Sequence, residues 1–156
     1  RSKVFDDQAF FRTFNQILER HYNNPGISNL SVADSSFDTW LDGYSLGIPN
    51  RKASIYMEGA LITFLLDVEI RKATQNKKSF DEVMRSFYDD FYKKGKGISE
   101  SDYKERVERI GGKEMSHYFD SFINGNKDFT KELREALSYL GLQMERKPSA
   151  LFQKPI

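Results

Sequence analysis

The chain has 156 residues, of which 38% are hydrophobic, which is enough for one compact domain with its own core but not for two. Its 24 basic and 23 acidic residues leave a formal net charge of +1, and this balance disfavours a dedicated nucleic-acid binder. An aromatic content of 14% excludes a disordered chain, and the absence of Cys excludes disulfide scaffolds, thiolate metal sites and cysteine nucleophiles.

The first third of the chain predicts two helices. Apolar residues recur at spacings of three and four between Val4 and His21, which is the pattern of one helical face turned toward a core. The segment Asn23–Gly26 is typical of a helix end. A second helix would begin at a Ser31 cap, with one side formed by Val32, Ser36, Phe37 and Trp40.

The most apolar stretch of the chain follows a predicted loop over 43–50. Ser54 is a candidate N-cap, and the residues from Ile55 to Arg71 are apolar on nearly every side of a helix. Such a helix must be covered all round. We therefore expect it to be the central, buried helix of the fold.

The remaining residues predict further helices. A capping box begins at Ser79, another short helix starts at Ser99, apolar spacing marks a helix after Met115, and Thr130 is a candidate cap for the last helix, which stops at Gly141. No stretch alternates with the period of a strand, and no run reaches the roughly 20 apolar residues that cross a bilayer. The predicted fold is all-α, an irregular array of about seven helices around the central one.

The titratable residues offer little chemistry by themselves. The two histidines, His21 and His117, lie far apart, so no H-E-x-x-H pair exists, and both are interpreted as surface residues. Asp67 and Glu69 sit beside basic residues and are interpreted as members of structural ion pairs. We predict no metal site within this chain.

Tyr56 is the one candidate for a chemical role. It falls in the first turn of the central helix, where backbone N–H groups place partial positive charge and a phenol can donate to an anion. Gly59, one turn on, costs roughly 1 kcal/mol against Ala in a helix, which suggests a close approach there. Local reasoning still favours an ordinary core tyrosine.

The order of several segments resembles the glycyl aminopeptidase family of metallopeptidases over about residues 30 to 145. The segments that carry the resemblance are Ser35–Trp40, Ser54–Leu61, Leu66–Arg71, Ser79–Arg85, Ile98–Tyr103, Tyr118–Phe119, Asn124–Gly125 and Leu140–Leu142. That family is similar in its catalytic domain to aminopeptidase N and other gluzincins. The resemblance implies that this chain is the helical half of such a domain over 1–142, with a tail or linker over 143–156.

The resemblance also implies a function. The zinc ligands and the catalytic glutamate would precede Arg1, and Tyr56 would match the tyrosine of a Y-x-K-G motif that stabilises the tetrahedral intermediate. Glu58 and Gly59 would support this site, and Trp40 would line the cleft. The substrates would be peptides with an N-terminal Gly or Ala, zinc would be present only in the full-length protein, and a PDZ-like domain could follow.

One position departs from the family. Glu58 stands where the family usually has Lys, which indicates either a rebuilt ion pair or an altered or lost activity. A non-catalytic helical module that binds a peptide or a protein therefore remains the alternative. We expect no tightly bound zinc and no peptidase activity from this chain alone, and an exposed apolar face beside Tyr56 and Trp40 that permits self-association. The compartment, whether periplasmic or cytoplasmic, stays open.

Overall fold

The computed structural model describes residues 6–37, 39 and 51–147 and is all-helical there, as predicted. Seven α-helices lie within the described residues, together with short 3-10 and π-helical turns. The α-helices are α1 (Asp7–Tyr22), α2 (Val32–Phe37), α4 (Ile55–Ala73), α5 (Phe80–Asp90), α6 (Glu100–Gly111), α7 (Ser116–Tyr118) and α8 (Thr130–Tyr139). The short turns are η1 (Pro25–Ser28), η2 (Tyr92–Lys94), η3 (Lys113–Met115) and the π-helical η4 (Phe119–Ile123).

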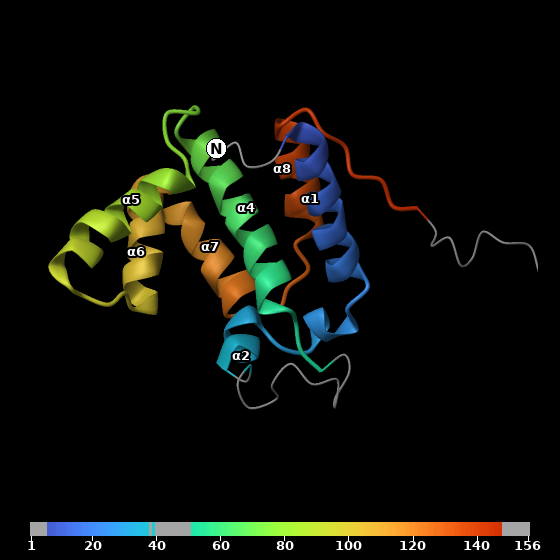
Figure 1. Cartoon of the computed structure of the whole chain (residues 1–156), viewed down its shortest axis with the longest axis horizontal. Coiled ribbons are helices and arrows are strands. Elements are labelled where there is room, and N and C mark those ends of the chain that lie inside the picture. The colour runs from blue at the N-terminus through green and yellow to red at the C-terminus, as the bar shows by residue number, and fades with distance from the viewer. Residues whose placement is uncertain (1–5, 38, 40–50, 148–156) are drawn as a thin grey trace, which may run out of the picture.

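Helix α4 is the centre of the array, which confirms the prediction made for the most apolar stretch. It packs against α1, α2, α5, α6 and α8. In Figure 1, α1 and α8 lie on one side of α4, and α5, α6 and α7 lie on the other. The core runs along α4 from Leu61 to Ile70 and includes Phe119 and Leu133 from the later helices. Apolar burial around this one helix therefore joins the two groups.

Polar side chains start most of the helices where the sequence indicated. Ser54 Oγ accepts from the N–H of Met57 at 3.4 Å and caps α4. Complete capping boxes open α5 at Ser79 and α6 at Ser99. The first of these boxes has an electrostatic effect as well, because the Ser79 backbone N–H that donates to Glu82 lowers the pKa of that carboxyl.

The start of α8 differs from the prediction. Thr130 is the first residue of this helix rather than its cap. Asp128 Oδ1 accepts from both the backbone N–H of Thr130, at 2.8 Å, and its hydroxyl, at 2.6 Å. The carboxylate therefore takes the capping role that the sequence suggested for Thr130, because it lies two residues earlier and can reach both donors.

Helix α2 begins at the predicted cap but turns Phe37 away from the core. The N–H of Asp34 donates to Ser31 Oγ at 3.0 Å, so the predicted cap is confirmed. Phe37, however, is 82% exposed, and Ser35 faces the core instead. A helix of only six residues has too little apolar surface to set its own rotation, so packing against α4 decides which side is buried.

Candidate functional site

Tyr56 lies on the outside of the first turn of α4. Its side chain is 59% exposed, so the core position that local reasoning favoured is wrong. Ser54, two residues earlier, caps the same turn. This turn begins a 19-residue helix, whose first backbone N–H groups carry a partial positive charge. The structure thus places a phenol at the surface beside the positive end of the longest helix it describes.

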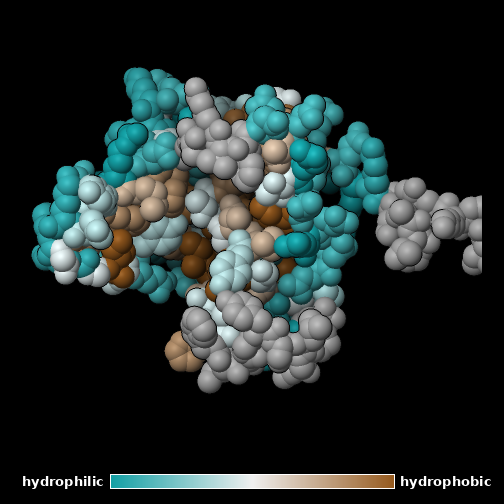
Figure 2. All heavy atoms as spheres, in the orientation of Figure 1, coloured by the Kyte–Doolittle hydropathy of each residue, from teal (hydrophilic) through white to brown (hydrophobic). Residues whose placement is uncertain are grey.

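Gly59 continues the same face one turn further along α4. Together with Ala60 it extends a strip that begins at Tyr56, and we call these three residues the outer face of α4. A Cβ atom added to Gly59 would meet no described atom within 4 Å, so the close approach suggested by the sequence is not found. Figure 2 shows apolar side chains gathered in the middle of the molecule, between the hydrophilic surfaces to either side.

Glu58 points the other way, into the protein. Successive helical residues are turned by about 100°, so Glu58 and Tyr56 lie on nearly opposite sides of α4. The Glu58 side chain is 4% exposed, and its Oε1 accepts from Nδ1 of His21 at 2.7 Å. His21 belongs to the last turn of α1 and is 3% exposed, so its predicted surface position is wrong. A buried acid–imidazole pair thus joins the start of α4 to the end of α1.

Aromatic rings hold the imidazole of His21 in place. Its ring stacks on Phe129, with centroids 4.8 Å apart and planes 25° apart, and it meets the ring of Tyr22 nearly at a right angle. His21 and Glu58 both line a cavity of about 460 Å³ between the end of α1, η1 and the loop before α8. Nε2 of His21 is buried and has no hydrogen-bond partner among the described residues, so Glu58 is the polar partner of this ring.

The chain just before α4 is held by the same corner of the molecule. Asn24 Nδ2 donates to the backbone oxygen of Lys52 at 3.2 Å. Gly26 lies so close that a Cβ atom there would stand 2.4 Å from that oxygen. The end of α1 and the start of η1 therefore contact the chain on both sides of Tyr56 in the sequence, at Lys52 before α4 and at Glu58 within it.

The other predicted residues are not brought into this site. Trp40 lies outside the described residues. Asp67 and Glu69 pair with Arg71 at 3.0 Å and Lys72 at 2.7 Å, which confirms that they are structural ion pairs. Over the described part of the chain, no three side chains of His, Asp or Glu gather into a group that could hold a metal ion.

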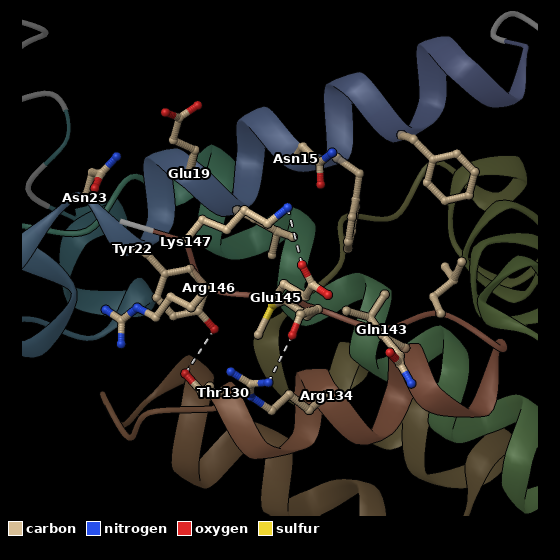
Figure 3. Close-up of a pocket in the computed structure, with 16 residues that line it drawn as sticks. Asn15, Glu19, Tyr22, Asn23, Thr130, Arg134, Gln143, Glu145, Arg146 and Lys147 are labelled. Atoms are coloured by element: carbon tan, nitrogen blue, oxygen red, sulfur yellow. Dashed lines mark hydrogen bonds and ion pairs between the residues drawn. The ribbon is translucent and has the colours of Figure 1, made fainter. Parts of the chain in front are cut away.

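A second cavity separates α1 from α8. It has a volume of about 750 Å³ and is crossed by the segment 142–147 (Figure 3). Arg134 of α8 donates to the backbone oxygen of Met144 at 3.0 Å, and the guanidinium of Arg146 lies over the ring of Tyr22. The apolar part of its lining comes from Phe11, Phe14, Leu18, Leu137, Leu142 and Met144. We call this cavity the α1–α8 groove.

The pairing of His21 with Glu58 is the feature that sequence reasoning missed. An acidic residue in the most apolar helix was the available signal, because a buried carboxylate needs a partner. His21 was interpreted as a favourable cation at a helix end, which is equally consistent with exposure. Nothing local connects the two residues, which are 37 positions apart.

Comparison with known proteins finds a family resemblance in the N-terminal part of the chain, which includes the start of α4. Residues 1–62 match the model of the M61 glycyl aminopeptidase family, a stretch shorter than half of the 156 residues. The match spans α1, α2 and the first turns of α4, including Tyr56, Glu58 and Gly59. It confirms the resemblance there, and residues 63–145 lie outside it. No curated protein and no solved structure matches the chain significantly.

Proposed function

We propose that this chain is the helical half of the catalytic domain of a metallo-aminopeptidase. The observation that carries the proposal is the family match that runs through the first turn of α4, where Tyr56 is exposed beside a helix N-terminus. In this proposal the outer face of α4 forms one wall of a substrate cleft. The substrate class that the resemblance implies is peptides with a small N-terminal residue, Gly or Ala.

Tyr56 is the residue of this chain that acts on the reaction. When water adds to a peptide carbonyl, the carbonyl oxygen gains negative charge, and a hydroxyl at the correct place can donate a hydrogen bond to it. A donor that is present before the reaction costs no reorganisation when the charge develops. The exposure of the Tyr56 phenol on a helix whose first turn is capped supports this role.

The described residues do not fit the zinc ion that the family implies, because no three possible ligands lie together. We therefore propose that the ligands belong to the part of the full-length protein before Arg1, and that the N-terminal half of the catalytic domain is the partner of the outer face of α4. The PDZ-like domain that often follows in this family is a further proposal for the full-length protein.

The decisive experiment is the substitution Tyr56→Phe in the full-length protein, assayed on glycyl and alanyl peptides. Loss of one oxyanion donor typically lowers kcat by about 10²–10³. We expect kcat to fall by that factor with little change in KM, because the lost interaction exists only in the transition state. Tyr88→Phe, which changes an exposed tyrosine on α5, is the matched control. An unchanged kcat for Tyr56→Phe would refute the role.

A non-catalytic peptide-binding module is the second candidate, and the α1–α8 groove favours it. The groove is large enough for several side chains and is lined by both apolar residues and arginines. The sequence before Arg1 distinguishes the two functions, since the aminopeptidase requires H-E-x-x-H followed by a glutamate ligand. If these ligands are replaced and peptides bind without being cleaved, the binding module is correct.

A further inference from the structure

We propose that the corner formed by His21, Asn24 and Gly26 is a positioning clamp for Tyr56. The inference rests on the proposed function of Tyr56 and names residues that act through it. The clamp contacts the chain at Lys52 and at Glu58, four residues before Tyr56 and two residues after it. None of its members needs to touch the substrate.

The contact at Glu58 sets the rotation of the first turn of α4. A carboxylate that is almost fully buried must keep its hydrogen-bond partner, because an unpartnered buried acid is strongly unfavourable. Its partner, His21, is itself wedged between Phe129 and Tyr22. Any rotation of the turn about the axis of α4 would pull Oε1 away from Nδ1, so the pair resists that rotation.

The contact at Lys52 sets the position of the chain that enters α4. Asn24 holds the Lys52 carbonyl by a hydrogen bond, and Gly26 allows the two backbones to approach more closely than any other residue would permit. Asn24 also accepts from the N–H of Gly26 at 2.9 Å, so donor and glycine are fixed relative to each other. Asn24 and Gly26 therefore contact the backbone oxygen of Lys52 in a fixed arrangement.

Together the two contacts fix the backbone from which the Tyr56 side chain extends. Glu58 and Tyr56 are about 200° apart around the axis of α4. The hydrogen bond that keeps Glu58 on the buried side of the helix therefore keeps Tyr56 on the exposed side. A hydroxyl that stabilises a transition state must be placed within a fraction of an ångström, and a displacement of 1 Å can lower a rate about 100-fold. Apolar packing of α4 does not supply this precision, because the first turn contributes only Glu58 to the buried residues of the helix.

The test uses the full-length protein with 3-fluorotyrosine placed at position 56. Glu58→Met keeps the approximate size of the side chain and removes the acceptor of the His21 hydrogen bond, and Gly26→Ala forces Lys52 away without touching Glu58. We expect each variant to lower kcat about 10- to 100-fold with little change in KM, and to shift or broaden the 19F signal. Asn24→Ala removes the hydrogen bonds to the Lys52 carbonyl and from the Gly26 N–H without introducing a clash, and it serves as the milder variant should Gly26→Ala fail to fold.

Two controls separate positioning from a general loss of stability. Val83→Ala opens a cavity in the core under α5 and should leave both kcat per folded molecule and the 19F signal unchanged. Glu58→Lys places a cation against His21, and adding His21→Glu gives that cation a carboxylate partner. Recovery of the 19F signal in that double variant would support the clamp.

The outcomes also distinguish this inference from the proposed function. If Tyr56→Phe lowers kcat but the clamp variants change neither kcat nor the 19F signal, the clamp is refuted and the function stands. If Tyr56→Phe has no effect on kcat, the function is refuted, and the 19F signal alone decides whether the corner positions this side chain. A clamp variant that lowers kcat equally in the presence and absence of the Tyr56 hydroxyl also refutes the clamp.

Discussion

The two ends of α4 are held in different ways. Its first turn is fixed by polar contacts, namely the Ser54 cap and the buried hydrogen bond between Glu58 and His21. From Leu61 to Ile70 the helix is held by apolar burial, with Leu65 and Leu66 fully enclosed. Hydrogen bonds depend on direction, whereas apolar burial depends mainly on area. One end of α4 is therefore held by contacts that depend on direction, and the other end by buried apolar area.

The largest expected effect lies at the apolar end. Leu65→Ala should lower the free energy of unfolding by about 2–5 kcal/mol, because it removes a fully buried side chain and leaves a cavity. Chemical denaturation measures this change. Activity per folded molecule should stay the same, since Tyr56 lies on the other part of the helix. A loss below about 1 kcal/mol would contradict the comparison and would mean that the core collapses around the vacancy.

A smaller effect is expected from the cap at the polar end. Ser54→Ala should cost about 0.5–2 kcal/mol, toward the lower limit because the hydrogen bond to Met57 is long, at 3.4 Å. Ser54→Asp, which can still accept that bond and also favours the positive end of the helix, should retain the stability. Thermal unfolding of both variants checks the prediction. Equal losses in both variants would show that capping does not hold this turn.

The apolar end also predicts a response to alkaline pH. Burial raises the pKa of Tyr118 well above its ordinary value, and the carboxylate of Glu69 on α4 raises it further. The unfolded phenol ionises near pH 10, so the stability that the buried neutral form contributes is present below that pH and is lost as the pH rises through and above it. The free energy of unfolding of Tyr118→Phe should therefore fall less steeply between pH 9.5 and 11 than that of the unchanged protein. Denaturation followed by circular dichroism at each pH measures this difference.

The control for this pH effect is Tyr88→Phe, which changes an exposed phenol on α5. Its stability should follow that of the unchanged protein over the same pH range. If Tyr118→Phe and Tyr88→Phe behave alike, the buried phenol is not the cause of the alkaline loss.

The smallest effect is expected away from α4 altogether. Lys93 and Asp89 form an exposed ion pair at 2.7 Å on the arm that contains α5 and η2. Lys93→Ala should change the free energy of unfolding by less than about 0.5 kcal/mol, and added salt should remove even that difference. A measured loss above 1 kcal/mol would show that this arm is held by more than its buried apolar residues.

Local chemistry explains which predictions from the sequence were confirmed. The caps at Ser54, Ser79 and Ser99 each bind a backbone group within three residues of themselves, so their partners are visible in the sequence. The ion pairs of Asp67 and Glu69 span three or four residues of one helix for the same reason. Burial of α4 followed from its composition, since a helix that is apolar on nearly every side must be covered.

The errors concern residues whose environment is made by distant segments. His21 was placed at the surface because its partner lies 37 residues away on another helix. The exposure of Phe37 is not predictable from the sequence, because a helix of six residues carries no reliable pattern of its own. Local reasoning predicts a core position for Tyr56, but the neighbouring Glu58 takes the buried side of that turn.

The sequence by itself determined the all-helical class, the start of most helices and the central place of α4, because these depend on composition and on contacts within one turn. Its resemblance to a peptidase family indicated Tyr56 as the candidate for a chemical role. Only the tertiary structure decided that Tyr56 faces outward, that Glu58 is buried and that His21 meets it. The physical reason is that a side chain's exposure depends on which other segments pack against its helix, and a linear pattern does not contain that packing.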